Sequence, residues 1–252
     1  MSAIAIAAIA LALILASIVG GLLLRARLPE AHLSGDSKEV IRLATALIGT
    51  MAAVVLALLF AATRGSFETN NAHVNRLTAG VMELEQLLKD YGPEGLSLRR
   101  ALRDDVVFMT ALVWRDGAAG PGQPLRPVAP EQTVLYQLRQ LAPGNAVQGA
   151  LQARALQVST DLEQIRLILL AQPPDSISKP FITVLVLWLM FIFASFSMSS
   201  KANTTLVIVL FVCAFSSASA IYLILELEQP FDGVMQIPVE PLRQVLLPLP
   251  VP

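Results

Sequence analysis

Cysteine, histidine and charge are all scarce in this chain of 252 residues, and each shortage excludes a class of explanation. Cys213 is the only cysteine, so no disulfide can form within the chain, and we expect it to act as a small buried apolar residue. The histidines, His32 and His73, lie in no spacing typical of a metal site, and we expect both at the surface. Charged residues make up only 15% of the chain, against about 25% in soluble domains. This deficit indicates a chain that lies largely in an apolar environment.

The sequence also lacks the motifs of common catalytic sites. It contains no G-x-S-x-G, no P-loop, no HExxH and no paired cysteines. The formal net charge of −1 gives no reason to expect a nucleic-acid partner. We therefore predict a protein that is not an enzyme and has no catalytic residue, cofactor or metal site.

Apolar residues are abundant, at 55% of the chain, and they concentrate in four long stretches. These lie at about residues 3–24, 40–63, 181–199 and 204–225. A helix needs about 20 apolar residues to cross the hydrocarbon core of a bilayer. The first stretch lacks the basic start of a signal peptide, so we expect it to be a retained anchor. The prediction is an all-α integral membrane protein with four transmembrane helices in a 2+2 layout.

The predicted domain organisation follows from these stretches. The first transmembrane pair occupies residues 1–63, and the second occupies residues 181–225. A helical extramembrane domain lies between them at 64–180, and a C-terminal tail with an acidic turn follows at 226–252.

The second span is predicted to continue beyond the membrane as one long helix. Apolar residues recur after it at steps of three and four, which is one face of a helix. They are Val74, Leu77, Val81, Leu84 and Leu88. We expect this helix to reach about Tyr91, where Gly92-Pro93 ends it.

Similar periodicity predicts further helices from Leu98 to Val113, over 131–141 and over 145–171, with a loop at 116–130. No segment has the period of a strand. The apolar faces of these helices have two interpretations, which are packing within one chain and packing between subunits around an axis.

An acidic stretch follows the fourth span, with Glu226, Glu228 and Asp232 within seven residues. Pro230 is expected to end the helix, and Asp232-Gly233 suits a turn. One interpretation is a helix-terminating turn with solvated acids. The other makes these three residues candidates for a pore mouth or gate that binds cations, because carboxylates at a helix C-terminus favour a basic partner or bound ion.

The second span is rich in small residues, which permit close helix packing in lipid. Its larger residues Ile48, Met51, Val55 and Leu58 recur at steps of three and four. A ring of such residues around an axis would form an apolar constriction of the kind that gates by dewetting. These four are the pore-lining candidates, with plain packing or contact with lipid as the alternative.

Three segments carry a resemblance to a known family: RLPEAHLSGDSKEVIRL (27–43), LLKDYGPEGLSLRRAL (87–102) and SASAIYLILELEQPFDGVMQI (217–237). They resemble the bestrophin-like domain family of bacterial membrane proteins, a family of unknown function, and the resemblance extends from Leu24 to Leu246. Many members have Asp at the position of Glu228, which is a conservative departure. The family is distantly related to bestrophins, which are pentameric anion channels whose second transmembrane segment lines an apolar neck.

The resemblance implies a homo-oligomeric ion channel in a bacterial inner (plasma) membrane, anion-conducting and pentameric by analogy, with its pore lined by the second span. The alternative is a membrane-anchored sensor or scaffold whose helical domain binds a partner or ligand. Orientation stays open. Basic residues in the loop Arg25–Arg42 place that loop in the cytoplasm and the middle domain outside, whereas bestrophins keep their middle domain in the cytosol.

Overall fold

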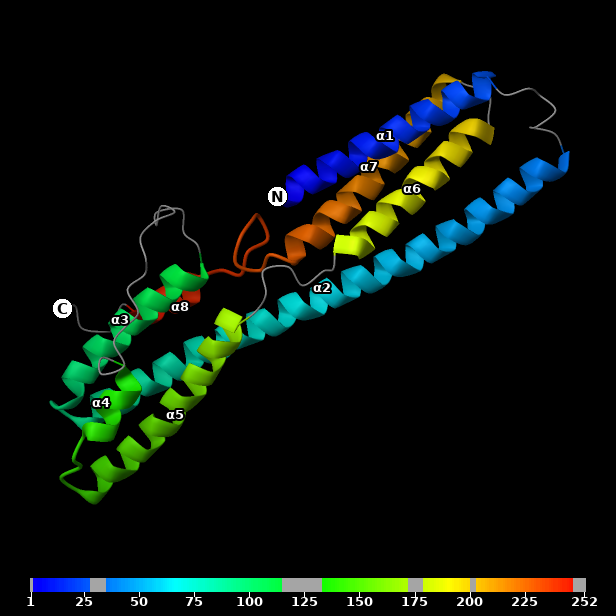
Figure 1. The fold of residues 1–252 in the computed structure, drawn as a ribbon. Coiled ribbons are helices and arrows are strands. Elements are labelled where there is room, and N and C mark those ends of the chain that lie inside the picture. The colour runs from blue at the N-terminus through cyan, green and yellow to red at the C-terminus, as the bar shows by residue number, and fades with distance from the viewer. Residues whose placement is uncertain (1, 28–34, 115–132, 172–178, 200–202, 247–252) are drawn as a thin grey trace. The chain divides into compact units, whose positions relative to one another are not determined.

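The computed structural model describes residues 2–27, 35–114, 133–171, 179–199 and 203–246. Throughout these residues all regular secondary structure is helical (Figure 1). The helices are α1 (Ala3–Arg27), α2 (Gly35–Tyr91), α3 (Gly95–Val113), α4 (Val134–Gln140), α5 (Ala146–Ala171), α6 (Lys179–Ser199), α7 (Thr204–Leu227) and α8 (Glu240–Leu246). Four of them, α1, α2, α6 and α7, are long and apolar enough to cross a membrane. The predicted all-α class with four spans is confirmed.

The chain divides into two compact units. The span unit comprises Met1–Phe67 and Asp175–Gln229, and the helical unit comprises Glu68–Pro174 and Pro230–Pro252. The C-terminal tail from Pro230 onward therefore belongs to the same unit as the helices between the two pairs of spans.

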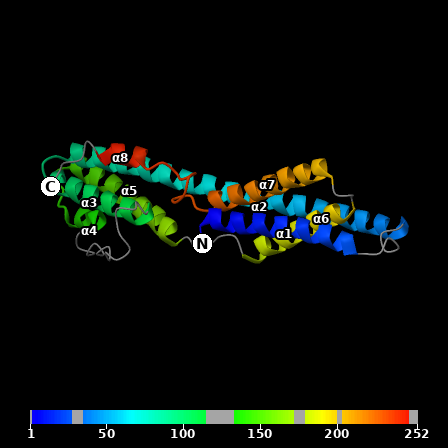
Figure 2. The ribbon, with the colours of Figure 1, turned by 90° about the horizontal axis from the view of Figure 1, so that it is seen from above.

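Within the span unit, α1 lies against both α6 and α7 (Figure 2). α1 and α6 run in one direction, and α7 runs in the opposite direction (Figure 1). Two apolar clusters hold these helices together, one around Ala52, Leu185 and Ile221 and the other around Ile14 and Phe193. The buried positions of α1 recur at steps of three or four, so a single face of this helix meets its neighbours.

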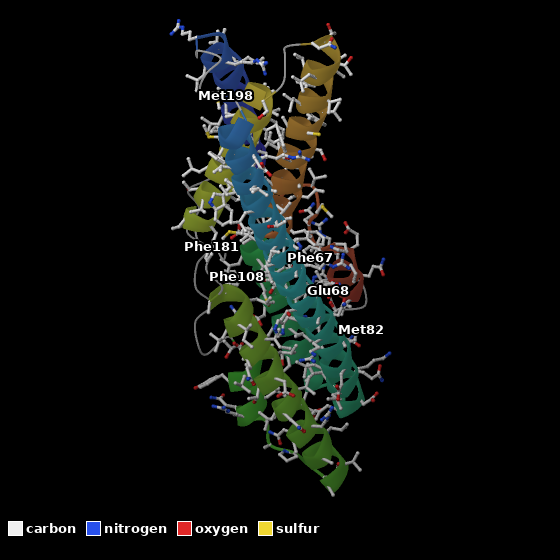
Figure 3. The ribbon with its side chains drawn as sticks, turned by 90° about the vertical axis from the view of Figure 1, so that its right-hand side faces the viewer. Phe67, Glu68, Met82, Phe108, Phe181 and Met198 are labelled. Carbon is white, nitrogen blue, oxygen red and sulfur yellow. The ribbon has the colours of Figure 1, made fainter. Side chains whose placement is uncertain are left out.

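α2 is one continuous helix of 57 residues, which confirms the predicted extension to Tyr91. At 1.5 Å per residue it is about 85 Å long. Its residues belong to the span unit as far as Phe67 and to the helical unit from Glu68, and Figure 3 labels both residues. The helix ends where Gly92 takes a φ of 114°, a conformation that favours glycine.

The helical unit has an apolar core built from the predicted helix faces. All five positions of the predicted α2 stripe are buried within the chain, and α3 contributes four more. They are Val74, Leu77, Val81, Leu84 and Leu88 with Leu98, Leu102, Val106 and Met109. These stripes therefore pack within one chain. Packing between subunits, which could hold as well, stays a prediction.

The structure corrects the predicted bounds of one helix and the predicted burial of two residues. The short helix expected over 131–141 is α4, which covers only Val134–Gln140 and begins at the side-chain cap of Thr133. The loop expected at 116–130 lies outside the described residues. Cys213 is exposed on α7, so its predicted burial is wrong, because it lies on the face that α1 does not cover. His73 is half-buried rather than on the surface, and His32 lies outside the described residues.

Candidate pore-lining helix and membrane exit

Two of the four predicted pore-lining residues lie on the uncovered face of α2, and the other two lie at its border. Met51 and Leu58 are exposed, at 47% and 65% of their full accessible surface, whereas Ile48 and Val55 are half-buried. The adjoining face of α2, which includes Ala52, packs into the cluster formed by α1, α6 and α7. The structure thus places all four on the membrane part of α2 but leaves only two of them freely accessible in one chain.

A wider apolar stripe follows the uncovered face of α2. Only 11% of the most apolar 18-residue window of α2 is buried, against 22–28% for the other three spans. The stripe comprises exposed residues at steps of three and four, namely Val40, Leu43, Leu47, Met51, Val54 and Leu58. Among the described spans, α2 therefore has the largest share of surface available to lipid or to another copy of the chain.

The threonines of this span add no free hydroxyl donor to the stripe. Thr45 donates to the carbonyl oxygen of Ile41 at 2.7 Å, and Thr50 donates to that of Leu47 at 2.8 Å. Such bonds to the preceding turn are a common way to satisfy hydroxyls within membrane helices. The uncovered face of α2 is therefore apolar in its available chemistry as well as in its composition.

The three acidic candidates at the end of α7 occupy different environments. Glu226 is buried, with 4% of its surface exposed, and its carboxylate accepts a hydrogen bond from the Tyr222 hydroxyl one turn earlier. Glu228 is half-buried at the C-cap of the helix, and neither glutamate is without a partner. Asp232 is exposed, and one of its carboxylate oxygens accepts from the Gly233 backbone N–H at 2.9 Å.

Throughout the described part of the chain, no three His, Cys, Asp or Glu residues lie where they could hold a metal ion. The turn itself is as expected, since α7 ends before Pro230 and Gly233 takes a φ of 92°. A role for Glu226, Glu228 and Asp232 at a pore mouth remains a prediction.

The sequence did not reveal that the segment after α7 packs onto α3. The Trp114 indole N–H donates to the Ile237 carbonyl oxygen at 2.8 Å, and its ring meets the edge of Phe231 at a centroid distance of 5.3 Å. Arg103 donates to the Leu246 carbonyl oxygen at 3.1 Å. Residues 230–246, which we call the C-terminal segment, are therefore an integral part of the helical unit.

The signal for this packing was present but weak. Four apolar residues of the C-terminal segment, separated by two or three positions, are buried: Ile237, Val239, Leu242 and Val245. α8 spans only seven residues, too few for a periodic pattern to stand out.

A charged cluster joins α3 to α5 inside the helical unit. Arg166 pairs with Asp105 at 2.8 Å and with Glu163 at 3.5 Å, and its guanidinium lies 5.7 Å from the Phe108 ring centroid. Figure 3 labels Phe108. Burial raises the pKa of Asp105 above its usual range, although Arg166 opposes this rise. Burial likewise raises the pKa of Glu163, again against Arg166, and the Asp105 charge adds to the rise.

The fold and its exposed apolar helices define a multi-pass α-helical membrane protein with a helical unit outside the spans. The Bestrophin-like domain family matches residues 11–242, and the chain belongs to this family. A search of the curated proteins and a search of the solved structures each gave no match.

Proposed function

We propose that this protein forms a homo-oligomeric ion channel in which copies of α2 surround the pore. The observation that carries the proposal is the apolar stripe of α2, the least covered of the four spans. Ile48, Met51, Val55 and Leu58 border or belong to this stripe and would form the constriction. The family relation supports conduction of anions and a pentamer by analogy, in a bacterial inner membrane.

An apolar constriction blocks ions because water leaves it easily, and a single hydroxyl can restore wetting. Leu58→Ser should therefore raise the rate of chloride efflux from liposomes, on the order of tenfold for a barrier lowered by ~1.4 kcal/mol. The fluorescence of a halide-sensitive dye in reconstituted vesicles measures this rate.

The matched control is Leu187→Ser on α6, since Leu187 is also an exposed leucine within a span. It should leave the efflux rate unchanged. Equal effects of the two variants would argue against α2 as the pore-lining helix. Wild-type vesicles that remain tight, with Leu58→Ser also silent, would favour the alternative of a membrane-anchored sensor or scaffold.

A further inference from the structure

A cleft of about 700 Å³ opens inside the span unit between the beginning of α2 and the end of α6. Its volume lies within the range of about 300–1,000 Å³ that is usual for small-molecule sites. α2 lines it with Glu39, Arg42, Leu43 and Thr45, and α6 lines it with Ser195, Phe196 and Ser199. Both helices are membrane spans, so the cleft lies where lipid has direct access to it.

The lining is charged at one end and apolar along its wall. Glu39 and Arg42 lie within the first two turns of α2, before its long uncharged stretch. Leu43 and Phe196 are both exposed and supply an apolar wall from either helix. This combination of a charged end and an apolar wall is the pattern that suits an amphiphile rather than a soluble ion.

The serine hydroxyls of the cleft offer acceptors rather than donors. Ser195 donates its hydrogen to the Phe191 carbonyl oxygen, and Ser199 donates to the Ser195 carbonyl oxygen, each at 2.8 Å. A hydroxyl oxygen that has donated its hydrogen retains lone pairs. The site thus favours a ligand group that brings its own hydrogen-bond donors.

The two charges of the cleft have opposite signs and do not neutralise each other directly. Among the described residues, no ion pair joins Glu39 to Arg42, although they are three positions apart on one helix. A guanidinium recognises phosphate, and a carboxylate recognises an ammonium group. The ligand that complements both charges carries a phosphate and an ammonium together.

We propose that this cleft binds a phospholipid whose headgroup contains a phosphate and a primary ammonium, as in phosphatidylethanolamine. Arg42 binds the phosphate, while Glu39 and the serine oxygens accept hydrogen bonds from the ammonium. The acyl chains lie along Leu43 and Phe196. The proposal goes beyond ion conduction and does not depend on it.

Native mass spectrometry of the purified, delipidated full chain tests this proposal. The protein is titrated separately with phosphatidylethanolamine, phosphatidylcholine and phosphatidylglycerol of identical acyl chains. Phosphatidylethanolamine should be retained in preference to both others. Phosphatidylcholine has no ammonium hydrogens to donate, and phosphatidylglycerol presents a net negative charge to Glu39.

Two variants separate the roles of the charges. Arg42→Gln should lower retention of phosphatidylethanolamine about tenfold, as loss of a charged hydrogen bond of roughly 1.4 kcal/mol predicts, whereas Arg42→Lys should retain most of it. Glu39→Gln should remove the preference for phosphatidylethanolamine over phosphatidylcholine. Arg100→Gln, at an exposed arginine of the helical unit, is the control and should change nothing.

Equal retention of the three lipids by the wild type would overturn the proposal, as would a preference that survives Glu39→Gln. The proposal would also be overturned if the wild type showed no lipid preference and Arg42→Gln changed the oligomeric mass. That result would assign the cleft to a contact between copies of the chain.

Discussion

Among single residues, one arginine of the helical unit pairs with two carboxylates. Arg166 serves two carboxylates, Asp105 and Glu163, and all three side chains are partly buried. Burial raises the pKa of both acids despite the arginine, so the folded chain takes up protons more readily than the unfolded chain over the range above their usual pKa values of 3.8 and 4.5. Such groups favour folding most at low pH, and this contribution is lost as the pH rises through the raised pKa.

Arg166→Gln should destabilise the protein at neutral pH and much less in mild acid. Without the arginine, the two partly buried carboxylates repel each other and lose their partner, which costs about 1–3 kcal/mol at pH 7. Lowering the pH favours protonation of both acids, whose pKa values burial raises, so a measurement at about pH 5 should show a smaller loss than one at pH 7. Thermal unfolding of the detergent-solubilised protein at both pH values measures the change.

Arg154→Gln provides the control, because its pair with Glu83 is exposed at 49% and 41% of the two side chains. An exposed pair contributes about 0–1 kcal/mol, so little change is expected at either pH. An Arg166→Gln loss that is equal at both pH values would contradict the account of the cluster.

Trp114 is the other residue on which a local structure depends, because it anchors the C-terminal segment. Trp114→Phe keeps an aromatic ring beside Phe231 but removes the hydrogen bond to the Ile237 carbonyl oxygen. The expected cost is about 0.5–1.5 kcal/mol, and limited proteolysis should cleave the C-terminal segment faster. Trp188→Phe in the span unit is the control, and faster cleavage in both variants alike would show that Trp114 is not a specific anchor.

At the element scale, α1 and α6 pack so closely that one position requires glycine. A Cβ added at Gly21 would clash with the Ser197 hydroxyl and would lie 2.6 Å from the Ala194 carbonyl oxygen. Ser197 is fully buried and its hydroxyl is bonded to that same carbonyl, so neither atom can move easily. Small residues at such crossings are what allow membrane helices to approach.

Gly21→Ala should therefore lower stability by roughly 1–3 kcal/mol, the usual range for overpacking. Gly20→Ala is a matched control one residue earlier, since a Cβ there meets nothing within 4 Å. It should be neutral or slightly stabilising, because alanine favours helix over glycine. Thermal unfolding of both variants decides the matter, and equal losses would refute the close crossing.

Sequence periodicity predicted the helices well where they are long and two-faced. The apolar residues from Val74 to Leu88 recur at helical spacing and so form one face of a helix, which predicted the extension of α2. Cys213 was misplaced because all faces of α7 are apolar, so the pattern does not show which face is covered. The packing of the C-terminal segment was missed because it depends on Trp114, which is over a hundred positions away from its partner Ile237.

The sequence pattern singled out the span that is least covered in the structure, but not which of its residues are exposed, and its role in a pore stays a prediction. Small and apolar residues identified the second span, and the structure shows that span to be the least covered. Leu58 is exposed and Val55 is half-buried because α2 is rotated about its axis so that Ala52 packs against the other spans. The composition of the helix carries no information about this rotation.

In the whole molecule, we propose that copies of the chain surround a pore lined by α2. From Leu47 to Leu58 the apolar stripe faces away from the other spans of the same chain, and the family relation supports the proposal of a channel. The stripe offers no charge and no free hydroxyl from its threonines, so ions would cross an apolar neck.

Planar-bilayer recording of the purified wild-type protein across a chloride gradient is the decisive test of this proposal. We expect discrete currents whose reversal potential shifts toward the chloride equilibrium potential. A protein that inserts into the bilayer as a homogeneous particle and passes no current would contradict it.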